Sequence, residues 1–518
     1  MKTYNIIKGI FAATVLSVVF SGCSEDAMDR INKDHGHTQS VAGRFILTDV
    51  ITSTAFSNAG GDFNTYLSAY IEYEVGVDNQ LYYAETRESE PTSSSTFNNT
   101  WNGLYSTLKS ARIIINQCSE GGIDYGNFAT KGMAEVLAAY NCALIADMFG
   151  DAPCSQAALV DENGSPVYLT PKMDKQEEIY TQAMQYLDDA IADLQKEDLI
   201  DPGAQDLLYQ GDAEKWLKLA YGLKARYTMH LLKRSANKDA DMEKVLEYVD
   251  NSFESAEEQA AFDVYDANNI NPLYGFFVAR AGLGASESMR SKLAEYNDPR
   301  LSRAFIITKQ GASGKEQAPG TADNAVYAPN GSPEQGTSKY GTSLFMYSIS
   351  APTLLLSYHE LKFLEAEALC RLGRDAKSAL KDAVVAGLLN AENSFSVSRK
   401  ELGKTLINPA SSITDTEAES YFDNTIEAKY TAEPLKTTMI QKYFALWGAS
   451  GEATESYNDV RRMKGLGENF IELKNPNSFP LRCPYGNSDT TTNAEVKAAY
   501  GNGQYVYSEN VWWAGGSR

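Results

Sequence analysis

The chain has 518 residues, of which 43% are hydrophobic, so it can bury a large core without disulfide or metal cross-links. Its 46 basic and 68 acidic residues give a formal net charge of −22, which excludes nucleic-acid binding as a main function because phosphate binding needs clustered Lys and Arg. Only four histidines are available for metal sites or for acid–base catalysis near neutral pH, whereas 31 tyrosines offer many flat, amphipathic contact surfaces.

The first 22 residues have the pattern of a secretion signal. Lys2 and Lys8 precede an uncharged, mostly apolar run, Gly9–Phe20. This run is shorter than the roughly 20 residues that span a bilayer. The residues up to Cys23 resemble a bacterial lipobox, although phenylalanine stands where leucine is usual. We therefore expect a lipoprotein signal peptide over 1–22 and lipidation of Cys23, whose acyl chains anchor the body to a membrane. An ordinary signal with a chance cysteine is the alternative.

Apolar residues recur every three or four positions in several later segments, which predicts amphipathic helices. These helices fall into pairs: 104–118 with 133–148, 176–194 with 213–233, 358–372 with 376–389, and 416–430 with 434–447. Stacked helix pairs are typical of tetratricopeptide-like scaffolds, although the repeat consensus is absent and the pair spacing is irregular. The sequence thus predicts a mainly α fold with about four helix pairs and few short strands.

Long segments outside the pairs are rich in Gly, Pro, Ser and Asn. Residues 257–355, apart from a helix near 286–296, are predicted to be loop, as are 390–413 and 466–510. Loops of this length are uncommon in a compact protein unless they carry function. The expected organisation is a helix-pair scaffold at about 100–250 and 356–450, with a loop-rich ligand face at about 40–100, 257–355 and 466–513.

Five cysteines follow Cys23, and no C-x-x-C pair occurs, which excludes zinc ribbons and thioredoxin chemistry. An exported protein can form disulfides, but an odd number of cysteines cannot pair completely within one chain. Because several of them fall in predicted helices, we favour buried free thiols that behave as small hydrophobes. These cysteines are Cys118, Cys142, Cys154, Cys370 and Cys483.

Glu360 and Glu367 lie seven residues apart on one predicted helix, and paired carboxylates can hydrolyse glycosides. The apolar stripe of that helix runs between them, and Glu367 can pair with Arg371 at i, i+4, so a structural role is favoured. The sequence has no nucleophile elbow, zinc-protease or phosphate-loop motif, and its histidines lack metal-ligand spacing. It therefore predicts no catalytic residue, no metal and no cofactor; only a structural calcium ion assembled from distant loops stays open.

Tyrosines outside the helical stripes are the candidates for ligand contact. A sugar ring stacks its C–H face on an aromatic ring, and its hydroxyls bond to Asp, Asn and Arg. Residues 78–87 combine two tyrosines with such polar groups, although a short strand of alternating burial accounts for them equally well. Residues 274–277 and tyrosines near 327–347 are further candidates. The predicted ligand-binding residues are Asp78, Asn79, Tyr82, Tyr83, Arg87, Tyr274, Phe276, Tyr340 and Tyr347.

Short motifs follow one another along the chain in a characteristic order. The most specific is Tyr358–Ala368 (YHELKFLEAEA), and others are Trp101–Tyr105, Phe149–Pro153, Asn297–Leu301 and Val511–Trp513. Together with the lipobox, this order resembles the SusD/RagB family of outer-membrane nutrient-binding lipoproteins.

The resemblance implies a single SusD-like domain over 23–518, lipid-anchored in the outer membrane and exposed at the cell surface. It further implies that the protein captures oligosaccharides, or peptides as in some members, and passes them to a SusC-like TonB-dependent transporter without catalysis. The alternative is an envelope helical-repeat lipoprotein that binds only other proteins in an assembly.

Overall fold

A computed structural model of the chain describes residues 41–161, 164–311, 314–320 and 326–518. The predicted signal peptide and Cys23 lie outside the described residues. The chain divides into two units, Met1–Ala42 and Gly43–Arg518, and the second unit contains every helix and strand given below.

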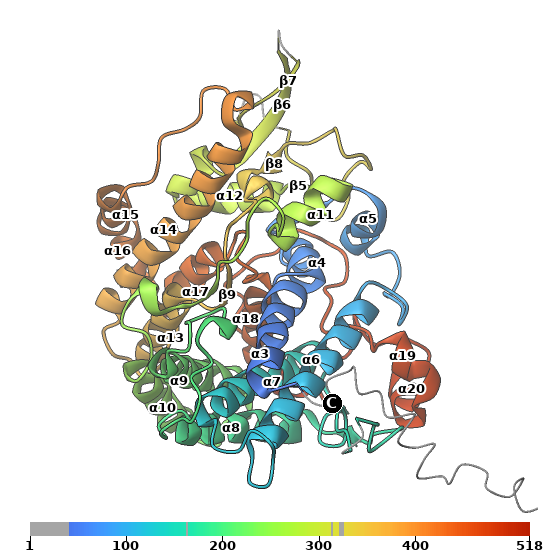
Figure 1. The fold of residues 1–518 in the computed structure, drawn as a ribbon. Coiled ribbons are helices and arrows are strands. Elements are labelled where there is room, and N and C mark those ends of the chain that lie inside the picture. Colours follow the sequence, from blue (N-terminus) through green and yellow to red (C-terminus); the bar gives the residue numbers. More distant parts are fainter. Residues whose placement is uncertain (1–40, 162–163, 312–313, 321–325) are drawn as a thin grey trace, which may run out of the picture. The chain divides into compact units, whose positions relative to one another are not determined.

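The predicted helix pairs are present and lie side by side (Figure 1). The pairs are α6 (Phe97–Cys118) with α7 (Phe128–Phe149), α8 (Gln176–Asp193) with α9 (Ala213–His230), α13 (Tyr358–Arg371) with α14 (Lys377–Leu402), and α15 (Asp415–Tyr421), η8 (Phe422–Ile426) and α16 (Glu427–Ala432) with α17 (Pro434–Ala445). A further helix, α10 (Lys238–Asp250), contacts both α9 and α13 and so joins the second pair to the third. The expectation of a mainly α scaffold of about four pairs is confirmed.

Helix α7 lies at the centre of this scaffold because it is apolar on all sides. It contacts α6, α8 and α9, and almost all of its residues are buried. Among the described residues it is the one helix long and apolar enough to cross a membrane, but its apolar window is enclosed within the body. It serves here as a core helix.

Two segments that were expected to be loops are helical. Helix α14 runs through 390–402 because its apolar stripe continues past Leu388 to Ala391 and Phe395, all of which are buried. Likewise, most of 43–86 is helical, in α3 (Gly43–Thr52), the π-helix η1 (Ser53–Ala59), α4 (Asp62–Tyr70) and α5 (Asn79–Thr86). The alternative of a short strand at 78–83 is therefore wrong, since α5 covers this stretch.

The segment 257–355 is irregular but contains more structure than predicted. The expected helix near 286–296 is α12 (Glu287–Glu295), and α11 (Pro272–Arg280) precedes it. The antiparallel strand pairs are β1 (Glu74–Gly76) with β5 (Leu283–Ala285), β2 (Ala152–Pro153) with β3 (Met173–Asp174), β4 (Ala260–Phe262) with β9 (Thr353–Leu356), and β6 (Phe305–Gly311) with both β7 (Gly314–Pro319) and β8 (Thr342–Ser343). The few, short strands agree with the predicted fold class.

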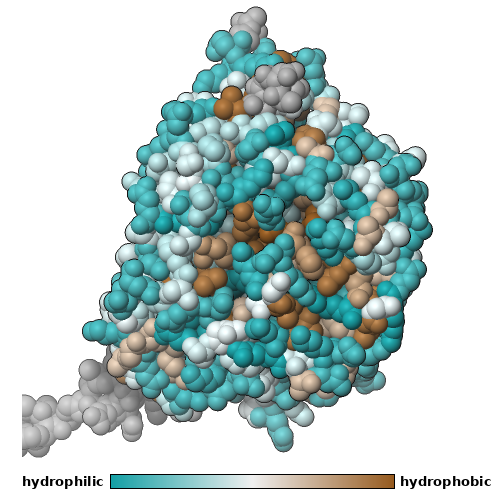
Figure 2. All heavy atoms as spheres, turned by 180° about the vertical axis from the view of Figure 1, so that it is seen from behind, coloured by the Kyte–Doolittle hydropathy of each residue, from teal (hydrophilic) through white to brown (hydrophobic). Residues whose placement is uncertain are grey.

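The C-terminal part follows α18 (Ala453–Leu466), which packs against α4. Beyond it the chain is mostly irregular as expected, apart from α19 (Asn487–Thr492) and α20 (Ala494–Tyr500). Short 3-10 turns connect the elements: η2 (Gly203–Gln205), η3 (Leu231–Arg234), η4 (Ala256–Glu258), η5 (Pro299–Ser302), η6 (Leu344–Tyr347), η7 (Gly403–Thr405) and η9 (Trp512–Ala514). Figure 2 shows a face covered mainly by hydrophilic residues, with hydrophobic ones gathered near its middle.

The five described cysteines are free thiols, and the expected burial is confirmed for four of them, whereas Cys370 is half-buried. Trp101, Trp216 and Trp513 are fully buried, and Trp447 is also in the core.

Buried charges link the helices across the core. The two terminal nitrogens of Arg462 on α18 donate to the carboxylate of Glu367 on α13 at 2.6 and 2.8 Å, and neither side chain is exposed. The Nε of Arg371 also donates to Glu367, at 2.8 Å, as the i, i+4 spacing predicts. Burial alone would raise the pKa of Glu367, but the two guanidinium groups outweigh it and hold that pKa well below its usual range.

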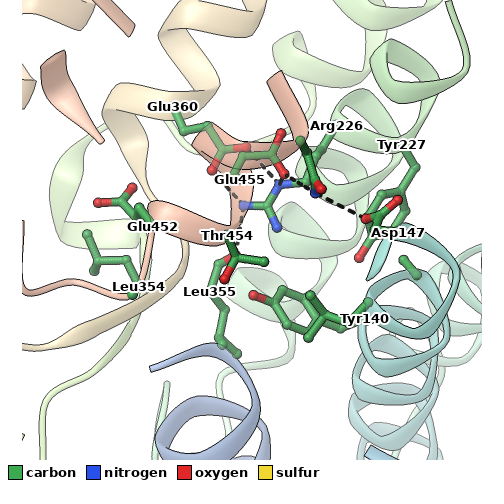
Figure 3. Close-up of a pocket in the computed structure, with 14 residues that line it drawn as sticks. Tyr140, Asp147, Arg226, Tyr227, Leu354, Leu355, Glu360, Glu452, Thr454 and Glu455 are labelled. Atoms are coloured by element: carbon green, nitrogen blue, oxygen red, sulfur yellow. Dashed lines mark hydrogen bonds and ion pairs between the residues drawn. The ribbon is translucent and has the colours of Figure 1, made fainter. Parts of the chain in front are cut away.

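A second buried cluster surrounds Arg226 of α9 (Figure 3). Its Nε and Nη2 donate to the two carboxylate oxygens of Glu360 at 2.7 and 2.6 Å, and Glu455 lies 3.9 Å from Nε. The cavity at this cluster measures about 20 Å³, which is room for about one water molecule and no larger ligand. Glu360 is thus a structural ion-pair partner, in agreement with the sequence interpretation.

His230, at the end of α9, extends the same cluster. Its Nε2 lies 2.8 Å from Glu455 Oε1, and its Nδ1 lies 2.9 Å from the Tyr180 hydroxyl and 3.5 Å from Asp147 Oδ2. Burial alone would lower the pKa of His230, but Glu455 and Asp147 outweigh it and raise the pKa to about 9. The ring is therefore an imidazolium at neutral pH, held between two carboxylates.

We expect Glu367→Ala to lower the free energy of unfolding by about 3–5 kcal/mol, because it removes a buried carboxylate shared by two guanidinium groups and leaves Arg462 with Asp459 alone. The matched control is Glu243→Ala, whose ion pair with Arg374 is half exposed and should be worth less than about 1 kcal/mol. Denaturant unfolding of both variants measures the difference. Equal losses in the two variants would contradict the structural role of the buried pair.

The charge on His230 should make stability depend on pH between about 6.5 and 9. Since the folded-state pKa is about 9 and the ordinary value is 6.5, its contribution is complete below pH 6.5 and is lost as the pH rises through 9. We expect the unfolding free energy of the wild type, minus that of His230→Gln, to fall by about 3 kcal/mol across this interval. A difference that stays constant from pH 6 to pH 9.5 would show that the ring is not charged in the folded protein.

Candidate functional site

A pocket with aromatic and polar walls lies where α11 meets η1, α4 and the first turns of α6. It has a volume of about 550 Å³. Its aromatic walls are Phe56 and Phe276, and its polar walls include Asp62 and Asn99. Phe276 also lines a much smaller hollow of about 10 Å³, together with Asp78 and Asn79, which is too small for a ligand in this conformation. We call these two hollows together the α11 cleft.

Helix α11 is held firmly at its first residue. The side-chain oxygen of Asn271 caps the helix by accepting from the backbone nitrogens of Leu273 and Tyr274 at 2.9 and 3.4 Å, and Pro272 occupies the first turn. The Asn271 amide nitrogen donates to the carbonyls of Ala351 and Ala449 at 2.8 and 3.1 Å. This buried side chain thereby ties the start of α11, and with it the cleft wall, to two distant segments.

The π-helix η1 forms the opposite wall. It presents Phe56, which is 40% exposed, and Asn58, which is fully buried at the floor. The Asn58 amide nitrogen donates to Asn141 Oδ1 at 2.8 Å, while its oxygen has no donor among the described residues. Gly103 of α6 leaves room here, because a Cβ on it would lie 2.9 Å from that oxygen. The floor therefore offers a buried hydrogen-bond acceptor that a ligand can use.

Polar groups surround Phe276. Its ring meets the Tyr66 ring edge-on at 6.4 Å, and the Arg280 guanidinium lies 6.0 Å from its centroid. Burial, aided by the Asp62 carboxylate, raises the pKa of Tyr66 to about 12, so its hydroxyl stays protonated and donates to Gln80 Oε1 at 2.9 Å. An aromatic face beside carboxylate, amide and guanidinium groups is the combination that sugar rings require.

Three of the predicted ligand residues meet in the cleft: Asp78, Asn79 and Phe276. The Asn79 amide donates to Asp78 Oδ2 at 2.9 Å, and Gln335 donates to Asp78 Oδ1 at 3.3 Å. Both residues stand at the start of α5, so the pair faces Phe276 from a helix terminus and not from a strand.

The other predicted residues lie outside the cleft. On α5, Tyr82 is half-buried and Tyr83 is exposed, and their rings contact each other at 5.8 Å. Tyr274 donates its hydroxyl to Glu401 at 3.0 Å. Tyr340 packs beside Val75, Val77 and Ala328, Tyr347 packs against Phe277, and Arg87 lines a different pocket.

Among the lining residues that the sequence analysis did not single out are Phe56, Asp62, Asn99 and Arg280. The search for ligand contacts concentrated on tyrosines, so it included Phe276 but missed Phe56 on the opposite wall. A usable signal was the pair Gly60-Gly61, which interrupts the helical segment before Asp62 and marks a close approach of backbone. Within the described residues, no group of three or more His, Cys, Asp or Glu side chains is placed to hold a metal ion, and the structural calcium ion stays a prediction.

Comparisons with known proteins identify the family. A family model described as "Starch-binding associating with outer membrane" matches residues 36–485. A crystal structure of a SusD/RagB family protein from Bacteroides thetaiotaomicron is 69% identical, with a TM-score of 0.88 over 92% of this chain and 100% of that chain.

More distant structures share the fold alone. A chitin-binding protein is 20% identical, with a TM-score of 0.68 over 92% of this chain and 99% of that chain. A SusD homolog from Bacteroides fragilis is 19% identical, with a TM-score of 0.67 over 92% and 100%. A comparison with curated proteins gave no match. The chain therefore belongs to the SusD/RagB family, whose matching family model is described as starch-binding and associated with the outer membrane.

Proposed function

We propose that this protein captures oligosaccharides, or peptides, at the cell surface and delivers them to a SusC-like TonB-dependent transporter without catalysing a reaction. The observation that carries the proposal is the α11 cleft, in which Phe56 and Phe276 stand beside Asp62 and Asn99 in a volume of about 550 Å³. This volume lies in the range of small-molecule sites. The description of the matching family as starch-binding supports a glycan as the cargo.

A binding role without chemistry accords with the placement of the carboxylates. Glu360 and Glu367 are bound to Arg226 and Arg462 in the core, out of reach of a substrate. In the cleft, Asp62 lines the larger hollow and Asp78 the smaller one. Each carboxylate thus stands as a hydrogen-bond acceptor for sugar hydroxyls.

The cargo contacts that we propose are Phe276, Asp62 and Asn99, which line the larger hollow, while Asp78 and Asn79 line the small hollow next to Phe276 and would reach cargo only if that hollow widens. The remaining predicted contacts, Tyr82, Tyr83, Arg87, Tyr274, Tyr340 and Tyr347, stay predictions for cargo long enough to leave the cleft.

Anchoring through Cys23 is part of the same proposal. Acyl chains on this residue would keep the binding body at the outer membrane, where a transporter partner is within reach. Mass spectrometry of the protein extracted from membranes tests it: we expect a chain that starts at Cys23 and carries lipid. An unlipidated chain cleaved elsewhere would contradict the anchor but not the cleft.

The alternative is an envelope protein that binds only other proteins through its helix pairs. In that case the cleft has no role in ligand binding. This alternative predicts that purified protein binds no oligosaccharide or peptide, and that cleft substitutions leave nutrient uptake unchanged.

We expect Phe276→Ala to weaken oligosaccharide binding at least tenfold, equivalent to about 1.4 kcal/mol, because the sugar loses its stacking surface. Val278→Ala is the control, since Val278 is on the same helix but is 62% exposed and does not line the cleft. Calorimetric titration with starch-derived oligosaccharides, other glycans and peptides measures the affinities. Binding that is equally strong in both variants would remove the cleft as the site. The absence of any binding, together with failure to co-purify a transporter, would overturn the function.

A further inference from the structure

A second pocket, separate from the α11 cleft, lies beside the segment that follows α18. Its volume is about 470 Å³, and none of its lining residues is shared with the cleft. Two cations line it, Arg87 from the end of α5 and Lys464 from the last turn of α18. Lys464 has no part in the proposed function, and Arg87 is named there only as a predicted contact for longer cargo.

Arg87 is held in place at some conformational cost. Its φ of 52° is in the left-handed region, which non-glycine residues adopt rarely and which is concentrated at functional sites. The residue is only 6% exposed, yet among the described residues its guanidinium has a single acceptor, the Tyr70 carbonyl, 3.1 Å from Nη2. The buried Nε has no acceptor within the described part of the chain. A buried charged donor without a partner costs more than a neutral one, so the site is incomplete as the protein alone supplies it.

Lys464 brings a second positive charge to the same place. Its Nζ lies 5.2 Å from the centroid of the Phe479 ring, and the Arg87 guanidinium lies 6.0 Å from the same centroid. Desolvation and the charge of Arg87 lower the pKa of Lys464 against the opposing effect of Glu72. Two like charges therefore flank one aromatic ring.

The nearby carboxylates accept hydrogen bonds from other groups or form no ion pair with the two cations. Glu85 accepts from the backbone nitrogen of Gly331 at 2.6 Å, and Glu72 accepts from the backbone nitrogens of Lys474 and Asn475 at 2.9 and 2.6 Å. Glu472 lines the pocket, but no carboxylate of the described residues forms an ion pair with Arg87 or Lys464. Among the charged residues that line this pocket, two are cations and one, Glu472, is a carboxylate.

We propose that this pocket binds the oxyanion group of a small ligand, a carboxylate or a sulfate, between the Arg87 guanidinium and the Lys464 ammonium. A planar guanidinium matches two oxygens of such a group at once, and a lysine adds a mobile point charge. The half-buried Phe479 ring and the exposed Asn469 amide supply an apolar face and a further donor for the rest of the ligand. This inference deepens the proposed function, because it assigns the cargo to the class of acidic ligands. It rests on the proposed function for the assumption that the ligand is cargo.

Titration calorimetry of the full chain in detergent at low ionic strength tests the proposal with three probes: glucuronate, inorganic sulfate and glucose. We expect glucuronate, sulfate or both to bind and glucose not to bind at this pocket, and we expect added salt to weaken the binding. Stronger glucuronate binding would identify a sugar acid as the ligand class, and stronger sulfate binding a sulfated one. Failure of both anions to bind, or equal binding of glucose, would overturn the proposal.

Variants locate the binding. Arg87→Gln and Lys464→Gln should each weaken anion binding at least tenfold, whereas Lys109→Gln, which removes the same charge from an exposed position on α6, should leave it unchanged. Lys464 is exposed, so its variant remains informative if Arg87→Gln fails to fold. Anion binding that survives both pocket variants would also overturn the proposal.

Phe276→Ala separates the two proposals. It should weaken oligosaccharide binding and leave glucuronate and sulfate binding intact. If the cleft proves not to bind cargo, anion binding that depends on Arg87 and Lys464 still establishes this pocket.

Discussion

The arrangement of the scaffold depends on charges that are buried and must be paired. Arg226 of α9 bonds to Glu360 of α13, and Arg462 of α18 bonds to Glu367 further along the same α13. Removing either carboxylate would leave a buried guanidinium with only part of its countercharge, Glu455 near Arg226 and Asp459 at Arg462, at a cost of several kcal/mol. Helices α9, α13 and α18 therefore pack with the register that satisfies both pairs, and His230 extends the cluster to Asp147 on α7.

The α11 cleft inherits its rigidity from this scaffold. Helix α4, which forms one wall, packs against α18, and Asn271 connects the start of α11 to the backbone at residues 351 and 449. The walls thus belong to elements that are fixed by the core, although α11 itself sits in an irregular segment. A binding site built this way needs little reorganisation when a ligand arrives, which limits the entropic cost of binding.

The sequence led to the fold more securely than to the site. Periodicity located the four helix pairs, because a stripe of apolar residues at three- and four-residue spacing forms one face only when the backbone is helical. It missed the continuation of α14 past residue 389 and the helices before residue 90, where Ser, Asn and Gly suggested loops although Phe395 and Leu67 are buried. At the site, tyrosine abundance drew attention to Tyr82, Tyr274 and Tyr340, whereas the cleft centres on Phe56 and Phe276, which lie in the short helices η1 and α11, in segments that were expected to be loops.

By itself, the sequence determined the helical scaffold, the expectation of a signal and lipobox at Cys23, and a family resemblance that the comparisons bear out. These features are local or follow chain order, so they can be read from spacing and motifs. Only the tertiary structure decided that Phe56 faces the same pocket as Phe276, and that Arg87 and Lys464 share one cavity. Those pairs are separated by hundreds of residues, and their meeting depends on packing that no local pattern encodes.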